Sequence, residues 1–216
     1  SGKRIVPIIM SFVMIAVSFV LLYVWPLDFG VLVSFGEYIQ GMGSVGAGIF
    51  GFANRMLIPL GLHHALNSVF WFDVAGINDI PNFLAGASGD GVAGITGRYQ
   101  AGFFPIMMFG LVGAALAFIK TARPEKREGV KAIMVAAAFA SFFTGVTEPL
   151  EFAFMFVAPV LYVLHAILTG LSLYIAAEFG WMSGFGFSAG LVDLVLSARN
   201  PLAVNWYMLL VQGVGF

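Results

Sequence analysis

The feature that most strongly limits the possible folds is an apolar run near the start of the chain, IVPIIMSFVMIAVSFVLLYVW (5–25), which contains no charged side chain. A helix of about 20 such residues is long enough to cross the hydrocarbon core of a bilayer. Tyr23 and Trp25 stand at its far end, and aromatic residues of this kind are enriched at membrane–water interfaces. We therefore predict that residues 5–25 form a membrane-spanning helix.

Three other windows have a similar character. They are 101–119, 152–177, which is long enough to tilt, and 200–216, which we interpret as a span cut short. In the whole chain 60% of the residues are hydrophobic and 10% are charged, whereas soluble domains carry about 25% charged residues. These proportions predict an all-α membrane protein that crosses the bilayer several times.

The composition also excludes several classes of function. The net charge is −1, so the chain lacks the basic field of a nucleic-acid-binding protein. There is no cysteine, which removes disulfides, thiolate metal sites and a cysteine nucleophile. The sequence holds no P-loop and no other nucleotide fingerprint. We expect no metal ion and no cofactor.

Two apolar segments are interrupted in ways that ordinary spans are not. Residues 38–72 contain Pro59 and many glycines, and residues 132–151 run into Gly145 and Pro149. Non-helical backbone at membrane depth survives only where it is buried in protein or lines a water-filled cavity. Paired interruptions of this kind point to a transporter binding site. We therefore expect two re-entrant hairpins around a ligand.

The remaining segments are more polar. Residues 26–40 and 189–199 mix apolar and polar side chains in the manner of amphipathic helices that lie at the membrane interface. Residues 73–100 are rich in Gly, Asp and Asn and predict a solvent-lined loop. The loop 120–131 carries five of the ten basic residues, and the positive-inside rule places it in the cytoplasm.

Glu148 and Glu151 lie inside strongly apolar sequence. A charged side chain in hydrocarbon costs about 3 kcal/mol or more, so it usually faces a cavity or a partner. Glu148 stands between Thr147 and Pro149, where a helix must break and a half-helix can begin. We expect it to accept hydrogen bonds from a polyhydroxylated ligand. For Glu151 two interpretations stay open, a ligand contact or a carboxylate that is solvated or caps the half-helix.

The block NRMLIPLGLHHALN (54–67) is the second polar cluster. Arg55 needs a partner, and its guanidinium suits carboxylate, phosphate or hydroxyl oxygens. His63 and His64 lack the spacing of a zinc site, so we prefer a hydrogen-bonding or proton-handling role for one of them. His165, inside a predicted span, is expected to be a satisfied core histidine.

These blocks are similar to those of a known family. GVTEPLEFAFMFVAPVLYVLHAILTG and NRMLIPLGLHHALN closely resemble the membrane IIC component of the phosphoenolpyruvate-dependent sugar phosphotransferase system, glucose superfamily. GIFGFANRMLIP, AGFFPIMMFGLVGAALA and SGFGFSAGLVDLVL resemble its N-acetylglucosamine-specific branch. The resemblance covers essentially all 216 residues. It implies that 1–216 is the transport part of a IIC domain, without the preceding spans and the following IIB domain.

The resemblance also implies roles for single residues. Glu148 matches the glutamate that bonds the sugar hydroxyls, and His63 matches the histidine near the 6-hydroxyl. Arg55 matches a basic residue of the same site, so His63 and Arg55 are the expected catalytic residues. Thr147 and Asn67 complete the expected substrate-binding set because they lie close to these residues in the sequence.

The implied function is group translocation in the bacterial plasma membrane, in which a sugar crosses and its 6-hydroxyl is phosphorylated. The implied partners are N-acetylglucosamine, the phosphocysteine of IIB, membrane lipids and, in the full-length protein, a second copy. Three alternatives stay open. The sugar could be glucose or a glucoside, the protein could be an ion-coupled secondary transporter, or this chain alone could bind sugar without activity.

Overall fold

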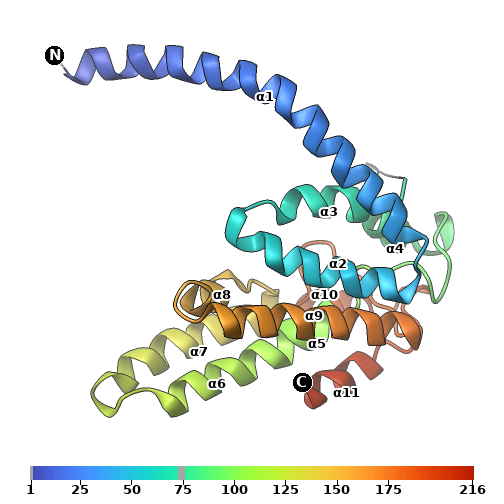
Figure 1. The fold of residues 1–216 in the computed structure, drawn as a ribbon. Coiled ribbons are helices and arrows are strands. Elements are labelled where there is room, and N and C mark those ends of the chain that lie inside the picture. The colour runs from blue at the N-terminus through green and yellow to red at the C-terminus, as the bar shows by residue number, and fades with distance from the viewer. Residues whose placement is uncertain (1, 73–75) are drawn as a thin grey trace.

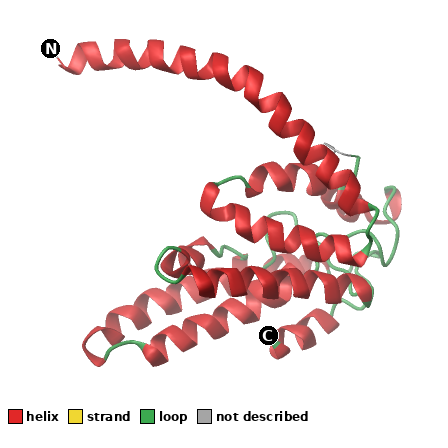
Figure 2. Cartoon of the chain, in the orientation of Figure 1, coloured by secondary structure: helices red, strands yellow, loops and turns green. Residues whose placement is uncertain are grey.

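The computed structural model describes residues 2–72 and 76–216, and every regular element within these ranges is helical (Figures 1 and 2). The α-helices are α1 (Gly2–Gln40), α2 (Ser44–Leu57), α3 (His63–Trp71), α4 (Asp79–Ala85), α5 (Phe103–Pro105), α6 (Leu111–Thr121), α7 (Arg127–Thr144), α8 (Glu148–Met155), α9 (Pro159–Glu178), α10 (Leu191–Ser197) and α11 (Met208–Gly215). Within the described ranges, three stretches are long and apolar enough to cross a membrane, Ile5–Gln40, Phe103–Thr121 and Pro159–Glu178. The chain is an all-α membrane protein, as predicted.

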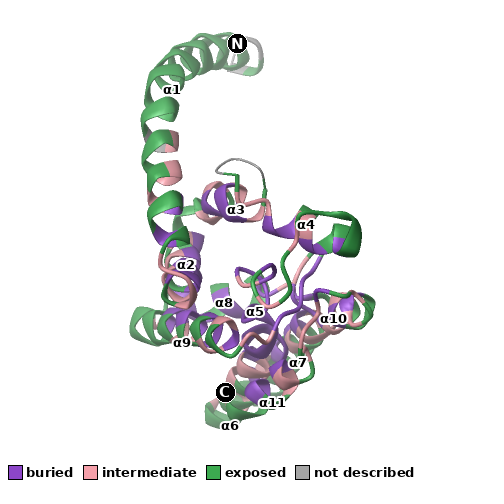
Figure 3. Cartoon of the chain, turned by 90° about the vertical axis from the view of Figure 1, so that its right-hand side faces the viewer, coloured by how far each residue is buried: buried purple, intermediate pink, exposed green. Residues whose placement is uncertain are grey.

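The first span is longer than predicted. We expected a separate interfacial helix over 26–40, but α1 continues through Pro26 to Gln40 as one curved helix (Figure 1). A proline bends a helix without ending it when neighbouring turns keep their hydrogen bonds. The end of α1 packs against the body through buried Ile39, while residues 5–22 are exposed along their whole length (Figure 3).

The other spans differ from prediction mainly at their ends. The second, Phe103–Thr121, confirms the window 101–119 and continues from α5 through a π-helical turn into α6. The third begins at Pro159 rather than at 152, because the chain turns at 156–158. A proline is favoured in the first turn of a helix, where its missing N–H is not needed.

The predicted span at 200–216 is wrong, because residues 198–207 form turns and only α11 (Met208–Gly215) is helical there. The segment 189–199 is helical as expected, in α10, and its position at the membrane interface stays a prediction.

The segment 73–100 is only in part the solvent-lined loop that its composition predicts, because 87–90 are exposed but other residues are buried. Residues 73–75 lie outside the described residues, but the rest contains α4 and several buried side chains, among them Asp79, Tyr99 and Gln100. Asp79 accepts hydrogen bonds from the backbone N–H of Gly97 and from Nε2 of Gln100, each at 2.8 Å. These bonds satisfy a buried carboxylate and fold the polar segment onto the body.

The helices of the body pack around two apolar cores. One lies between α2, α3, α5 and α9, and the other lies between α6, α7, α8 and the start of α9. Helices α2 and α9 pack closely, and a Cβ on Gly170 would lie 2.8 Å from the carbonyl oxygen of Gly48. Small residues let membrane helices approach in this way. This contact fixes α2, which carries part of the candidate site.

Candidate functional site

The first wall of the site is the break between α2 and α3. A 3₁₀ turn, Ile58–Leu60, follows α2, and Gly61 then adopts φ 71°, a left-handed conformation that favours glycine. Pro59 cannot donate the hydrogen bond that would continue the α-helix. The chain therefore reverses into α3, which begins at His63, so this histidine and Arg55 stand on opposite sides of one turn.

The second wall is the break between α7 and α8. Helix α7 ends at Thr144, and Gly145 adopts φ 72°. A Cβ on Gly145 would lie 2.7 Å from Oγ of Ser188, so only glycine fits beside the segment 183–190. Pro149 stands in the first turn of α8, which begins at Glu148. The two interruptions predicted from the sequence are thus confirmed as helix breaks.

The two breaks enclose a cavity of about 460 Å³. Its size lies within the range of about 300–1,000 Å³ that is typical of small-molecule sites. All five residues that the sequence predicts for the site line this cavity, namely Arg55, His63, Asn67, Thr147 and Glu148. These residues come from α2, α3 and the start of α8, and they are brought together although Arg55 and Glu148 lie more than 90 positions apart in the sequence.

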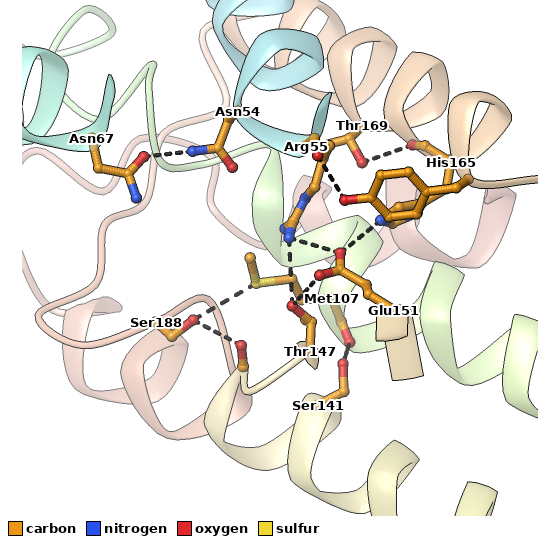
Figure 4. Close-up of polar contacts among 12 residues, drawn as sticks. Asn54, Arg55, Asn67, Met107, Ser141, Thr147, Glu151, His165, Thr169 and Ser188 are labelled. Carbon is orange, nitrogen blue, oxygen red and sulfur yellow. Dashed lines mark hydrogen bonds and ion pairs between the residues drawn. The ribbon is translucent and has the colours of Figure 1, made fainter. Parts of the chain in front are cut away.

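A buried ion pair connects the two walls (Figure 4). Nη1 of Arg55 donates to Oε1 of Glu151 at 2.8 Å, and the hydroxyl of Thr147 donates to Oε2 of the same carboxylate at 3.2 Å. The side chains of Arg55 and Glu151 are 3% and 0% exposed. The hydroxyl of Tyr162 donates to the carbonyl oxygen of Arg55 at 2.6 Å. Arg55 is thus held from both its backbone and its side chain.

Neither interpretation of Glu151 fits this cluster, because Glu151 does not line the cavity and so makes no ligand contact there. It is neither solvated nor merely a cap, because it is fully buried and its carboxylate is occupied by Arg55, Thr147 and His165. Nε2 of His165 lies 2.8 Å from Oε1 of Glu151. His165 is therefore a satisfied core histidine, as expected, and it supports the ion pair from the side away from the cavity wall.

Three polar groups at the cavity have no protein partner among the described residues. Nε and Nη2 of Arg55 and Nδ1 of His63 are buried without a hydrogen bond. The carboxylate of Glu148, on an exposed residue that lines the cavity, likewise has no bonded partner there. Unsatisfied buried groups are costly, so a ligand that reached them would gain by pairing with them.

His63 lies outside the three candidate spans, stacked against His64 with ring centroids 4.0 Å apart. Burial lowers the pKa of His63, and the neighbouring His64 and Arg55 act in the same direction. At neutral pH the ring is therefore neutral and can accept a proton. Within the described residues there is no group of three His, Asp or Glu side chains arranged to hold a metal ion.

Sequence reasoning missed several residues that line the cavity. The polar ones are Asn54 and Ser188, and the apolar ones include Trp71, Phe103 and Met107. Asn54 directly precedes Arg55 in a block already singled out, so its position was a usable signal. The apolar residues gave none, because aromatic and methionine side chains in a membrane helix are most often packing residues.

Comparison with known proteins gives consistent matches. The profile of the family described as "Phosphotransferase system, EIIC" matches residues 1–170. A "PTS system N-acetylglucosamine-specific EIICB component" of Bacillus subtilis is 50% identical over 206 residues, 94% of this chain and 45% of that protein. An N-acetylglucosamine-specific EIIC component of Streptomyces coelicolor is 50% identical over 218 residues, 96% of this chain and 49% of that protein.

A glucose-specific EIICBA component of Staphylococcus saprophyticus is 40% identical over 226 residues, 99% of this chain and 33% of that protein. The chain thus spans between about a third and a half of the length of these relatives.

Proposed function

The chain belongs to the EIIC family of the phosphotransferase system, and on that premise we propose that it binds N-acetylglucosamine, moves it across a bacterial plasma membrane and presents its 6-hydroxyl for phosphorylation. The observation that carries the proposal is that five residues predicted from the sequence line one cavity between two broken helices. The higher identity to the N-acetylglucosamine-specific relatives than to the glucose-specific one supports the choice of sugar.

In this proposal Glu148 binds the sugar ring. Its carboxylate lines the cavity and can accept hydrogen bonds from two hydroxyl groups at once. Thr147 and Arg55 border the same space, and the two buried N–H groups of Arg55 can donate to an oxygen of the sugar that comes within reach. Asn67 lines the opposite wall. These assignments make Glu148 the residue on which binding depends most.

The proposed chemistry is transfer of a phosphoryl group from a cysteine of IIB to the sugar. The bond between phosphorus and the 6-oxygen forms while the sulfur–phosphorus bond breaks, and the sulfur leaves as a thiolate. The hydroxyl proton passes to His63, whose neutral ring can accept it. Positioning supplies much of the acceleration in phosphoryl transfer, and Arg55 offers positive charge close by. The anionic product is then repelled by Glu148.

The same proposal covers the finer points of architecture. The α2–α3 and α7–α8 segments serve as the two re-entrant hairpins, because each reverses at a break that lines the cavity. Residues 1–216 form the transport part of a IIC domain that works with IIB, in a dimer of the full-length protein. The support for a IIB partner is that curated relatives combine the two components, as their EIICB and EIICBA names state.

The experiment that tests the proposal is equilibrium binding of N-acetylglucosamine to the purified chain, with glucose as competitor. We expect saturable binding that Glu148→Gln abolishes and that Glu128→Gln, a matched change on an exposed residue of α7, leaves intact. Equal affinity in the Glu148→Gln variant would refute the role of Glu148. Equal competition by glucose would overturn the choice of sugar.

Two further measurements separate the rival functions. Uptake that depends on the proton gradient and yields free sugar inside would favour an ion-coupled transporter over a phosphotransferase. If the folded, monodisperse chain binds the sugar but added phospho-IIB does not phosphorylate it, the chain only binds sugar.

A further inference from the structure

Two buried asparagine side chains face each other across the first break. Nδ2 of Asn54 on α2 donates a hydrogen bond to Oδ1 of Asn67 on α3, and both residues line the cavity. This bond uses the NH₂ group of one amide and the oxygen of the other. It leaves Oδ1 of Asn54 as an acceptor and Nδ2 of Asn67 as a donor, neither with a partner among the described residues.

The pattern of free groups does not depend on how the two amides are turned. A primary amide has one accepting oxygen and one donating NH₂ group. Whichever amide donates within the pair, the two together present one free oxygen and one free NH₂ group. In Figure 4 the two free atoms point to the same side, toward Met107 and Ser188, which also line the cavity.

We propose that this amide pair recognises the acetamido group of the sugar. The free oxygen of Asn54 accepts from the acetamido N–H, and the free NH₂ group of Asn67 donates to the acetyl carbonyl. A secondary amide offers one donor and one acceptor on opposite edges, so it complements the pair when the acetamido group lies between the two free atoms. A hydroxyl at the same carbon must donate to one free group and accept from the other through a single oxygen atom, whereas the acetamido group reaches them with two separate atoms, so a sugar with a hydroxyl there binds less well.

The spacing along α3 fits this assignment. His63, Asn67 and Trp71 are four residues apart, so they lie on one face of the helix, and all three line the cavity. Each step of four residues advances about 6 Å. In a pyranose, the carbon that carries the 6-hydroxymethyl group and the carbon that carries the acetamido group lie across the ring from each other. With the 6-hydroxyl at His63, the acetamido group falls near Asn67, and Trp71 offers an apolar surface to its methyl group.

This inference rests on the proposed function, and its test compares two ligands. N-acetylglucosamine carries the acetamido group, and 2-deoxyglucose has no polar group at that carbon. The variants are Asn54→Asp and Asn67→Asp. In either variant the remaining amide donates to the new carboxylate, so both free atoms are acceptors and nothing donates to the acetyl carbonyl. The matched control is Asn205→Asp, an exposed asparagine outside the cavity.

We expect each cavity variant to lower the affinity for N-acetylglucosamine about tenfold or more, the usual effect of losing a buried hydrogen bond. The affinity for 2-deoxyglucose should change less than about threefold, because this sugar has no group that hydrogen-bonds to the amide pair. Asn205→Asp should change neither. An equal loss for both sugars, or none for N-acetylglucosamine, overturns the assignment.

A measurement on the unaltered protein keeps the test valid if the variants do not fold. The N-methyl derivative of N-acetylglucosamine keeps the acetyl carbonyl but has no amide N–H. We expect it to bind about tenfold or more weakly than the parent sugar, and equal affinity overturns the role of Asn54.

Failure of the two proposals gives different results. If Glu148→Gln abolishes binding of both sugars while Asn54→Asp keeps the wild-type preference, only the amide-pair assignment fails. If the unaltered chain binds neither sugar, both fail.

Discussion

Replacement of Glu151 by glutamine tests the buried cluster that joins the two walls of the site. Glutamine has nearly the same shape and can still accept from Nη1 of Arg55, so the change removes the negative charge and little else. It leaves the guanidinium of Arg55, 3% exposed, without a counter-charge. Two unit charges about 4 Å apart attract by ~4 kcal/mol at an effective dielectric constant of ~20. Breaking a buried pair on one side costs about 3–5 kcal/mol.

The assay is thermal unfolding of the purified protein in detergent. For a chain of this length, each kcal/mol shifts the melting temperature by roughly 2–4 °C, so we expect Glu151→Gln to melt about 10 °C below wild type. Arg55→Met in the same chain should recover part of this loss, because it removes the unpaired charge. The exposed Glu128→Gln is the control and should shift the melting temperature by less than about 2 °C. The reasoning would be refuted if Glu151→Gln melted like wild type. It would also be refuted if the double variant lost as much stability as the Glu151→Gln and Arg55→Met variants lose in sum.

Three more outcomes follow from the structure. His63→Ala should spare sugar binding and slow phosphorylation by phospho-IIB, and an equal loss of both would show that His63 serves binding rather than proton transfer. Gly170→Val should lower the melting temperature by several degrees, because a Cβ there meets the carbonyl oxygen of Gly48, and an unchanged value would contradict that contact. Burial raises the pKa of Asp79 to about 6, so folding favours its protonated form and stability rises as the pH falls. The free energy of unfolding should be roughly 1 kcal/mol higher at pH 5 than at pH 7.5, so the melting temperature should also be higher at pH 5. Asp79→Asn should remove this difference, and a difference that persists in the variant would contradict Asp79 as its source.

The helix breaks were predictable because their causes are local. Pro59 lacks the N–H that would continue α2, and Gly145 adopts a left-handed conformation that other residues rarely take. The predicted boundary between the span 5–25 and the helix 26–40 was wrong, because α1 runs through Pro26 without ending. The span that corresponds to α9 was also predicted to begin too early, at 152, because apolar composition cannot distinguish a turn from a helix when both are apolar.

The ends of α1 and α9 therefore depend on packing. The segment 73–100 shows the same limit for polar sequence, since Asp79 is buried by Gln100 and Gly97, whose approach is not visible in the sequence.

The sequence by itself determined that this chain is a helical membrane protein of the EIIC family and where two of its helices break, and it singled out five polar residues that line one cavity. Those conclusions rest on residue types, on local spacing and on the resemblance of sequence blocks to the family, all of which the chain carries without folding. Only the tertiary structure decided that Glu151 pairs with Arg55 and that His165 supports it. It also decided that Asn54 and Asn67 form one hydrogen-bonded pair at the cavity. These contacts join positions up to 96 residues apart, and their geometry comes from the packing of α2, α3, α8 and α9 rather than from any local pattern.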